Sequence, residues 1–247
     1  MPGLLKKCSW MVRGCFVHLD SEDGVYRATV GDRTWYIPFP KRWMALWALE
    51  FMEAHHRYQQ YLQPEDTIIE VGACTGEYAV PAALRVEKGH LWAFEPDPVS
   101  FLCLKKNVHS AGLTDRITLV NRAISDKDGE TLSFTAPDNT VAGGALSTED
   151  GQMQMETVTL DTYLEQNPIR ERIGLLKITV NGFEPEVILG AAQTLERVDS
   201  LSFQSERHEE TEQLASRHGF EVVESDDLGN GVRCVFMARE PEQLASQ

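Results

Sequence analysis

Residues 67–77 have the sequence Thr67-Ile68-Ile69-Glu70-Val71-Gly72-Ala73-Cys74-Thr75-Gly76-Glu77, and this stretch decides the fold. It begins with a short apolar run interrupted by Glu70, which is typical of a parallel strand buried on both faces. A turn with two glycines follows, and we expect a helix from about residue 77 to residue 87. Glycine allows a ligand to approach the backbone, and the first turn of a helix offers unpaired N–H groups. The stretch therefore predicts a nucleotide-binding site at the carboxyl end of the strand.

A second acidic residue follows the next predicted strand. Residues 90–94 form another apolar run, and Glu95 comes directly after it, 19 residues beyond Gly76. A carboxylate in this place can accept hydrogen bonds from both hydroxyl groups of a ribose. Each feature alone also fits an ordinary turn or a surface acid, since lone glycine patterns are weak signals. Together they favour a site for a nucleoside.

Length and composition narrow the class of protein. The chain has 247 residues, which fits one large α/β domain with an N-terminal extension. Its 23 basic and 38 acidic residues give a net charge of −15, which disfavours nucleic acid as a partner. The five cysteines are scattered and form no C-x-x-C pair, so they indicate neither a zinc site nor a disulfide framework. With no leader-like or membrane-spanning apolar run, we expect a soluble cytoplasmic protein without a membrane partner.

Changes in residue composition and pattern along the chain predict its domain boundaries. We expect an N-terminal extension over residues 1–40, a main domain over 41–240 with an inserted hairpin at about 130–160, and a tail over 241–247. In the extension, Val25–Val30 and Thr34–Ile37 flank a turn and predict a hairpin. Residues 1–50 carry more basic than acidic side chains, unlike the remainder. A lid or a homodimer contact is one interpretation, and an ordinary edge extension is the other.

The rest of the chain alternates between strand and helix patterns. The further expected strands are Ile117–Val120, Thr131–Phe134, Glu156–Leu160, Ile173–Val180, Leu201–Gln204, Phe220–Val223 and Val232–Met237. The expected helices are Arg42–Leu62, one capped by Asp97, one capped by Asp161, Pro185–Val198 and Glu209–His218. This gives four or five β-α units and a closing hairpin, a layout that many folds share and that does not name a function.

As a set, these residues resemble the FkbM-type S-adenosylmethionine-dependent methyltransferases over roughly residues 64–210. The matching segments are Glu70-x-Gly72-Ala73-x-x-Gly76, Phe94-Glu95-Pro96, Asn121–Gly129, Val158–Asp161 and Leu175–Ala191. The resemblance implies an α/β, Rossmann-like class I methyltransferase fold. This fold has a mostly parallel seven-stranded sheet with an antiparallel closing strand and helices on both faces.

The resemblance also implies how S-adenosylmethionine is bound. Glu70 and the backbone of Gly72, Ala73 and Gly76 would hold its amino-acid end. Glu95 and Pro96 would lie at the ribose, and Arg122 and Ala123 would flank the adenine. The implied acceptor is a hydroxyl group of a small molecule, such as a sugar or a secondary metabolite. An NAD-linked oxidoreductase is disfavoured, because Cys74 stands where the dinucleotide fingerprint requires glycine.

Three positions depart from the family pattern at the end of the fourth core strand. Thr179 and Asn181 stand where the family has Asp and Glu, and Phe183 stands where it has Ala. Divalent ions prefer hard, usually anionic, oxygen ligands, so we expect no metal site. The departures leave open a second interpretation, a catalytically silent relative that serves as a binding or scaffold protein.

A hydroxyl acceptor benefits from a general base, and the candidates near predicted strand ends are His208, Glu206, Glu184 and Asp161. Of these we select His208, Glu184 and Asp161 as the catalytic candidates. A histidine can titrate near neutral pH, although a surface histidine that opens a helix is an equally good interpretation of His208.

Overall fold

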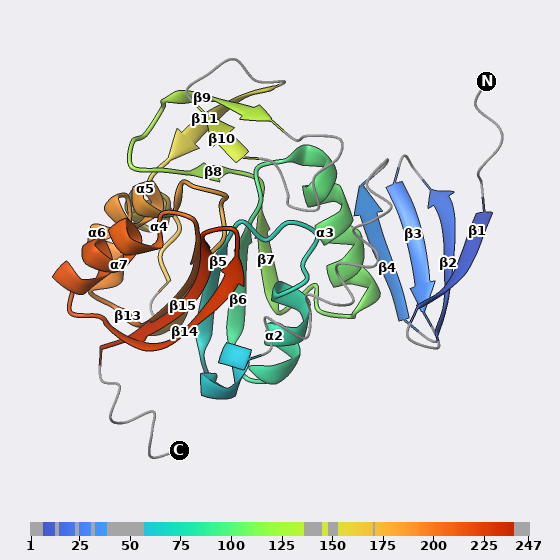
Figure 1. Cartoon of the computed structure of the whole chain (residues 1–247), viewed down its shortest axis with the longest axis horizontal. Helices are drawn as coiled ribbons and strands as arrows, with labels where there is room; N and C mark the ends of the chain where they lie inside the picture. The colour runs from blue at the N-terminus through green and yellow to red at the C-terminus, as the bar shows by residue number, and fades with distance from the viewer. Residues whose placement is uncertain are drawn as a thin grey trace.

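The computed structural model describes residues 7–12, 15–22, 25–30, 33–38, 57–135, 145–147, 153–169 and 171–239. Within these residues the chain forms three sheets (Figure 1). The largest has seven strands in the order β14-β15-β13-β12-β5-β6-β7. Its strands are β5 (Thr67–Val71), β6 (His90–Phe94), β7 (Ile117–Val120), β12 (Ile173–Ile178), β13 (Val198–Ser205), β14 (Glu221–Gly229) and β15 (Val232–Ala238).

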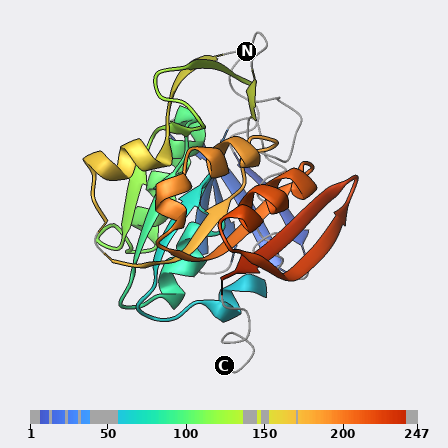
Figure 2. The ribbon, with the colours of Figure 1, turned by 90° about the vertical axis from the view of Figure 1, so that its left-hand side faces the viewer.

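The central sheet confirms the predicted class. Strands β5, β6, β7, β12 and β13 pair in parallel, and β15 runs antiparallel to both β13 and β14. The closing hairpin β14–β15 lies at one edge of the molecule (red in Figure 2). All residues of β5 and β12 are buried, as expected of parallel strands at the centre of a sheet.

Helices cover both faces of this sheet. Ile68 and Ile69 are neighbours in β5 and point to opposite faces, where they join two separate apolar cores. On the Ile68 face lie α2 (Ala79–Arg85) and α3 (Pro98–Ser110). The Ile69 face is covered by α4 (Leu160–Gln166), α5 (Glu184–Leu189), α6 (Ala192–Leu195) and α7 (His208–Arg217).

The N-terminal region forms an antiparallel sheet with the order β1-β2-β3-β4, and β4 lies beside α3 (Figure 1). Its strands are β1 (Lys7–Val12), β2 (Cys15–Glu22), β3 (Val25–Val30) and β4 (Arg33–Pro38). The β3–β4 pair is the hairpin that the turn signal predicts. The other two strands were not predicted, because their sequences lack a clean apolar alternation.

A second small sheet has the order β10-β9-β11-β8 and contains the inserted antiparallel strands. Its strands are β8 (Ala123–Ile124), β9 (Thr131–Thr135), β10 (Ala145–Ser147) and β11 (Met153–Val158). Most of the predicted loop at 136–152 lies outside the described residues. So does most of the predicted helix Arg42–Leu62, whose last turn is a 3-10 helix at Arg57–Tyr61.

Two helix predictions were wrong in detail. The single helix expected over Pro185–Val198 is broken into α5 and α6 at Gly190, where a Cβ atom would lie 2.0 Å from the carbonyl oxygen of Ser125. Asp161 does not cap α4; the hydroxyl of Thr159 does, by accepting from the N–H of Thr162. The carboxylate of Asp161 instead accepts from the start of α6.

Candidate active site

The turn after β5 is fixed by its neighbours on both sides. The N–H groups of Gly72 and Ala73 both donate to the carbonyl of Phe94 at 2.9 Å, at the end of β6. Gly72 has a φ of 85°, and a Cβ atom there would lie 1.9 Å from the carbonyl oxygen of Thr179, after β12. Only glycine fits both the backbone conformation and the close approach. The turn is therefore held at the carboxyl ends of three neighbouring strands, where α/β sheets bind ligands.

Glu95 lies at the end of β6 and faces this turn. The side chain is 6% exposed; its Oε2 accepts from the N–H of Cys74 at 2.7 Å and its Oε1 from the N–H of Asp97 at 2.9 Å. Burial raises the pKa of Glu95 to about 8; the charges of Asp97 and Glu77 add to the rise, and the two N–H groups oppose it. Each carboxylate oxygen can accept a second hydrogen bond. Glu95 is thus an oriented acceptor at the edge of the turn.

Glu70 lies on the middle strand of the site and is paired with Lys177. Its Oε1 accepts from Lys177 Nζ at 3.1 Å, and the same amine donates to Thr179 Oγ1 at 3.0 Å and lies 5.0 Å from the ring centre of Tyr78. Burial raises the pKa of Glu70, and Lys177 opposes this. Glu70 Oε2 is buried without a hydrogen-bond partner among the described residues. It is a buried acceptor on the strand that leads into the turn.

The segment after β7 lies against Glu95. The side-chain amide of Asn121 donates to the carbonyls of Glu95 at 2.8 Å and Pro96 at 2.9 Å. Arg122 is exposed, whereas Ala123 is buried in β8 and packs with the small sheet. The structure therefore places the residues predicted for ribose and adenine next to one another.

Glu184 lies on the other side of β5, after β12, and is fully buried. Its Oε1 accepts from the N–H of Val180 at 2.9 Å, and its Oε2 accepts from the N–H of Gly182 at 3.0 Å and the hydroxyl of Ser205 at 2.8 Å. Burial raises the pKa of Glu184, and these three donors oppose the rise. The carboxylate shapes the loop after β12 and joins it to the end of β13.

The other two candidate bases lie in different surroundings. Asp161 accepts from the N–H groups of Gln193 at 2.8 Å and Thr194 at 2.7 Å, which engages its carboxylate at the start of α6. His208 is the first residue of α7, with a side chain 18% exposed and Nδ1 3.5 Å from Glu212 Oε1. Of the three, His208 is the one whose side chain is not committed to backbone N–H groups.

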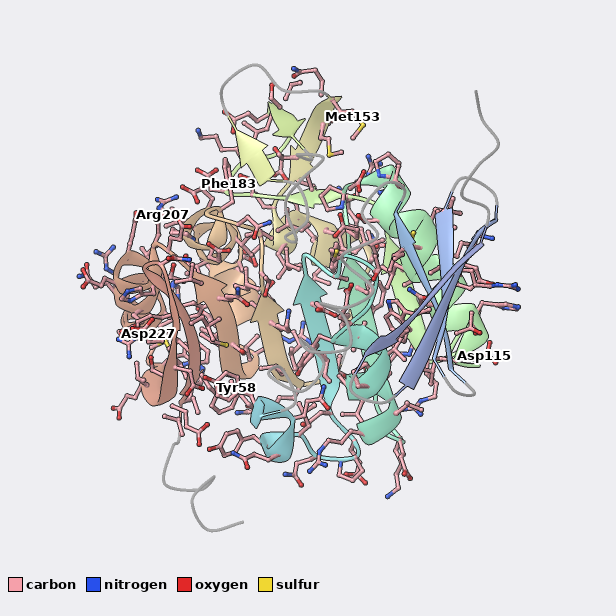
Figure 3. The ribbon with its side chains drawn as sticks, turned by 45° about the vertical axis from the view of Figure 1, so that its right-hand side comes forward. Tyr58, Asp115, Met153, Phe183, Arg207 and Asp227 are labelled. Atoms are coloured by element: carbon pink, nitrogen blue, oxygen red, sulfur yellow. The ribbon has the colours of Figure 1, made fainter. Side chains whose placement is uncertain are left out.

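Two further residues shape this side. Arg207 Nη1 donates to the carbonyl of Gly182 and to Glu186 Oε1, both at 2.8 Å, so the loops after β12 and β13 are joined. Phe183 packs against the buried pair Ala123 and Leu132 of the small sheet, as Met153 and Met155 do. Figure 3 shows Arg207 and Phe183 at the same end of the molecule as Met153. The small sheet therefore contacts the loop after β12.

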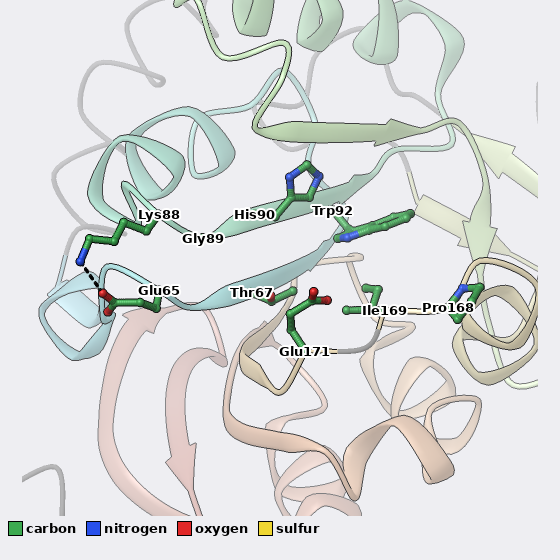
Figure 4. Close-up of a pocket in the computed structure, with 9 residues that line it drawn as sticks. All are labelled: Glu65, Thr67, Lys88, Gly89, His90, Trp92, Pro168, Ile169 and Glu171. Carbon is green, nitrogen blue, oxygen red and sulfur yellow. Dashed lines mark hydrogen bonds and ion pairs between the residues drawn. The ribbon is translucent and has the colours of Figure 1, made fainter.

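A cavity of about 400 Å³ opens at the opposite, amino end of the sheet (Figure 4). Its lining consists of Glu65, Thr67, Lys88, Gly89, His90, Trp92, Pro168, Ile169 and Glu171. No local sequence pattern indicates this cavity, because its residues come from the starts of three separate strands. It does not include any of the predicted site residues.

The described residues contain no group of three or more His, Cys, Asp or Glu side chains placed to hold a metal ion. In the same part of the chain, every helix is too short or too polar to cross a bilayer.

The comparison with protein families identifies the domain. The sequence model of the methyltransferase FkbM domain matches residues 70–222, more than half of the chain. The chain belongs to this family. The match begins at Glu70 and includes Glu95, Arg122, Glu184 and His208.

Among curated proteins, this FkbM-family chain is similar to the 2-O-methyltransferase NoeI of Sinorhizobium fredii. The two are 27% identical over 162 residues, which is 58% of this chain and 65% of that protein. The match thus covers less than two thirds of the relative.

Two solved structures share the fold. One is precorrin-6y C5,15-methyltransferase from Geobacter metallireducens, with a TM-score of 0.50 at 12% identity over 76% of this chain and 87% of the other. A Clostridium thermocellum protein suggested to be an rRNA methylase also has a TM-score of 0.50, at 14% identity over 76% and 94% of the chains. Both support the Rossmann-like methyltransferase fold.

Proposed function

We propose that this FkbM-family methyltransferase uses S-adenosylmethionine to methylate a hydroxyl group of a small molecule, such as a sugar or a secondary metabolite. Family membership supports methyl transfer. The named activity of the NoeI relative, a 2-O-methyltransferase, supports an oxygen acceptor. The net charge of −15 favours a small acceptor over nucleic acid.

The chemistry of the donor and acceptor groups fits S-adenosylmethionine. The N–H groups of the turn from Gly72 to Gly76 are already taken by protein acceptors. The groups that remain for a ligand are hydrogen-bond acceptors. They are Oε2 of Glu70, which has no hydrogen-bond partner among the described residues, and the two oxygens of Glu95, each of which accepts one hydrogen bond. An ammonium group and two ribose hydroxyls are donors that match them. When bound, the cofactor supplies a methyl group that a positively charged sulfur makes electrophilic.

The chain's own residues orient the two reactants. Glu95 would hold the ribose and Glu70 the amino end, while Asn121, Arg122 and Ala123 would border the adenine. On the acceptor side, Glu184 and Asp161 fix loop and helix ends. His208 is left as the proposed proton acceptor, because its side chain accepts no backbone N–H group of the described residues and an imidazole can act as a general base. Much of the rate then comes from holding the acceptor in line.

The observation that carries this proposal is the orientation of Glu95 by two backbone N–H groups. Calorimetry with S-adenosylmethionine and S-adenosylhomocysteine tests it. Glu95→Ala should weaken binding by about 1–3 kcal/mol, because buried polar partners lose their acceptor. Glu65→Ala, an exposed acid at the opposite end of β5, is the control and should bind like the unmodified protein. Absence of binding at millimolar ligand would end the proposal.

A second candidate function is a silent relative that binds the nucleoside without catalysis. Thr179 and Asn181 favour it, because they stand where the family pattern has two carboxylates, and Thr179 Oγ1 accepts a hydrogen bond from Lys177. Mass spectrometry of a sugar and metabolite panel incubated with labelled methyl donor separates the two candidates. Any labelled product rejects the silent relative.

The setting of the protein is also part of the proposal. The five cysteines are scattered along the chain and form no C-x-x-C pair, which favours the reducing cytoplasm. We also propose that the protein forms a homodimer through the N-terminal sheet. Light scattering of the full chain, which measures the molar mass in solution, tests this.

A further inference from the structure

A buried amide side chain of α3 binds the edge of the N-terminal sheet. Strand β4 is the last in its sheet, so the backbone of Tyr36 faces outward from it. Asn107 of α3 is 1% exposed; its Oδ1 accepts from the N–H of Tyr36 at 2.6 Å, and its Nδ2 donates to the carbonyl of Tyr36 at 2.9 Å. The side chain of Asn107 thus replaces the next strand for this edge.

The same contact reaches the turn after β5. Nδ2 of Asn107 also donates to the carbonyl of Thr75 at 2.8 Å, and Trp35 Nε1 on β4 donates to Thr75 Oγ1 at 3.1 Å. The Thr75 hydroxyl donates to Glu77 Oε1, and the Thr75 N–H donates to Glu77 Oε2 at 3.1 Å. Every polar atom of Thr75 is therefore engaged, and the residue is fully buried.

Thr75 stands between two residues in the left-handed region. Cys74 has a φ of 49° and Gly76 a φ of 98°. A non-glycine residue with positive φ persists where its surroundings fix it. The N–H of Cys74 is the group that orients Glu95 Oε2, at 2.7 Å. The contacts of Thr75 to β4 and α3 therefore hold the backbone that aims the carboxylate.

We infer that Trp35 and Asn107 are positioning residues of the cofactor site, so that the N-terminal sheet is a working part of that site. This rests on the proposed use of S-adenosylmethionine. Neither side chain need touch the cofactor, because both act through Thr75 and Cys74 on Glu95. Docking of β4 on α3 sets the affinity of the site.

Calorimetry with S-adenosylhomocysteine on full-length variants tests the inference. Trp35→Phe removes one donor and should weaken binding about 3- to 10-fold, and Asn107→Leu removes three hydrogen bonds and should weaken it about 10- to 100-fold. The matched control is Tyr61→Phe, which removes a ring donor to Glu224 Oε1 at 2.9 Å on β14, away from the turn. It should leave binding unchanged. The KM for the methyl donor should rise while kcat changes little.

A double-mutant cycle and amide exchange separate positioning from general damage. In a Thr75→Val background, Trp35→Phe should have no further effect on affinity, whereas Thr75→Ser should keep the unmodified response. Exchange of the Cys74 amide should be faster in Trp35→Phe and unchanged in Tyr61→Phe.

The outcomes are distinguishable. Unchanged affinity in both Trp35→Phe and Asn107→Leu, with normal binding by the unmodified protein, would overturn the inference and leave the proposed function standing. If the unmodified protein does not bind, the proposed function falls. Faster Cys74 exchange in Trp35→Phe would then still support positioning of the turn, and unchanged exchange would overturn that as well.

Discussion

Two buried glutamates flank β5, one on each neighbouring strand end, and they differ in what binds them. Glu95 follows β6 and receives one backbone N–H on each oxygen. Glu184 lies beyond β12 and receives three donors, two from its own loop and one from Ser205. Burial raises the pKa of both. The difference shows that hydrogen-bond partners decide what a buried carboxylate can do. Glu95 accepts two hydrogen bonds and can accept more from a ligand, whereas Glu184 accepts three that fix the loop after β12.

The glycines on the two sides differ in the same way. Gly72 abuts the carbonyl of Thr179, whereas a Cβ atom at Gly182 would meet nothing within 4 Å. The turn after β5 is therefore closely packed, and the loop after β12 has room at Gly182.

The largest expected effect comes from filling these two glycines. Gly72→Ala should lower the free energy of unfolding by about 3–5 kcal/mol, because the added methyl overlaps a backbone carbonyl. Gly182→Ala should cost about 1–2 kcal/mol, from its φ of 104° alone. Urea unfolding of both variants measures the difference. Equal losses would break the comparison between a packed and an open side.

The next effect concerns Lys177, which joins the two sides by binding Glu70 and Thr179. Lys177→Met should lower the free energy of unfolding by about 3–5 kcal/mol, because Glu70 would be a buried charge without its partner. Adding Glu70→Gln should recover most of that loss. Denaturant titration of the single and double variants measures it, and a double variant no more stable than Lys177→Met would contradict the pairing.

The cofactor side is predictable from sequence because its signals are local. The glycines, the short apolar strand and Glu95 lie within one β-α-β unit, and their spacing alone indicates a nucleoside site. The fold class follows from the same alternation of strand and helix patterns. Asp97 as a helix cap is equally local, since it accepts from residues two and three positions on.

The remainder depends on contacts that no local pattern encodes. Tyr36 and Asn107 are 71 positions apart, and Trp35 and Thr75 are 40 apart. An apolar periodicity continues through Gly190, so one helix was expected where two form. The engagement of Glu184 by Ser205 requires knowing that β13 lies beside β12. Residues chosen as bases by their chemistry therefore include carboxylates that the fold uses for its own loops.

A smaller effect separates positioning from proton transfer on the acceptor side. Glu184→Gln should lower the free energy of unfolding by about 1–3 kcal/mol, because an amide presents one oxygen where three donors need two. The pH–rate profile of Glu184→Gln should keep both of its limbs, whereas the profile of His208→Asn should lose one limb. Ser205→Ala, which takes away one donor, is the stability control at about 1 kcal/mol. If the pH–rate profile of Glu184→Gln loses a limb, Glu184 is a general base after all.

The most gradual effect, and the one that sharpens the comparison most, is in the pH dependence, because it is spread over several pH units. Because the pKa of Glu95 is raised to about 8 from 4.5, the folded protein keeps a proton that the unfolded chain has released between these pH values. The free energy of unfolding should therefore fall as pH rises through this window, by up to about 1.4 kcal/mol for each pH unit. Glu95→Gln should flatten this slope, and thermal unfolding across the window measures it.

Glu184→Gln should also flatten part of that slope, because burial raises the pKa of Glu184 in the same direction. Affinity distinguishes the two. A ribose hydroxyl donates best to an ionised carboxylate, so binding of S-adenosylhomocysteine by the unmodified protein should strengthen as pH rises toward 8. Glu95→Gln should abolish this trend and Glu184→Gln should keep it, because among the described residues Glu95 accepts one hydrogen bond on each oxygen at the turn, whereas Glu184 accepts three, two within the loop after β12 and one from Ser205. If both substitutions abolish the trend, the two carboxylates share one site and the division between the two sides of β5 is wrong.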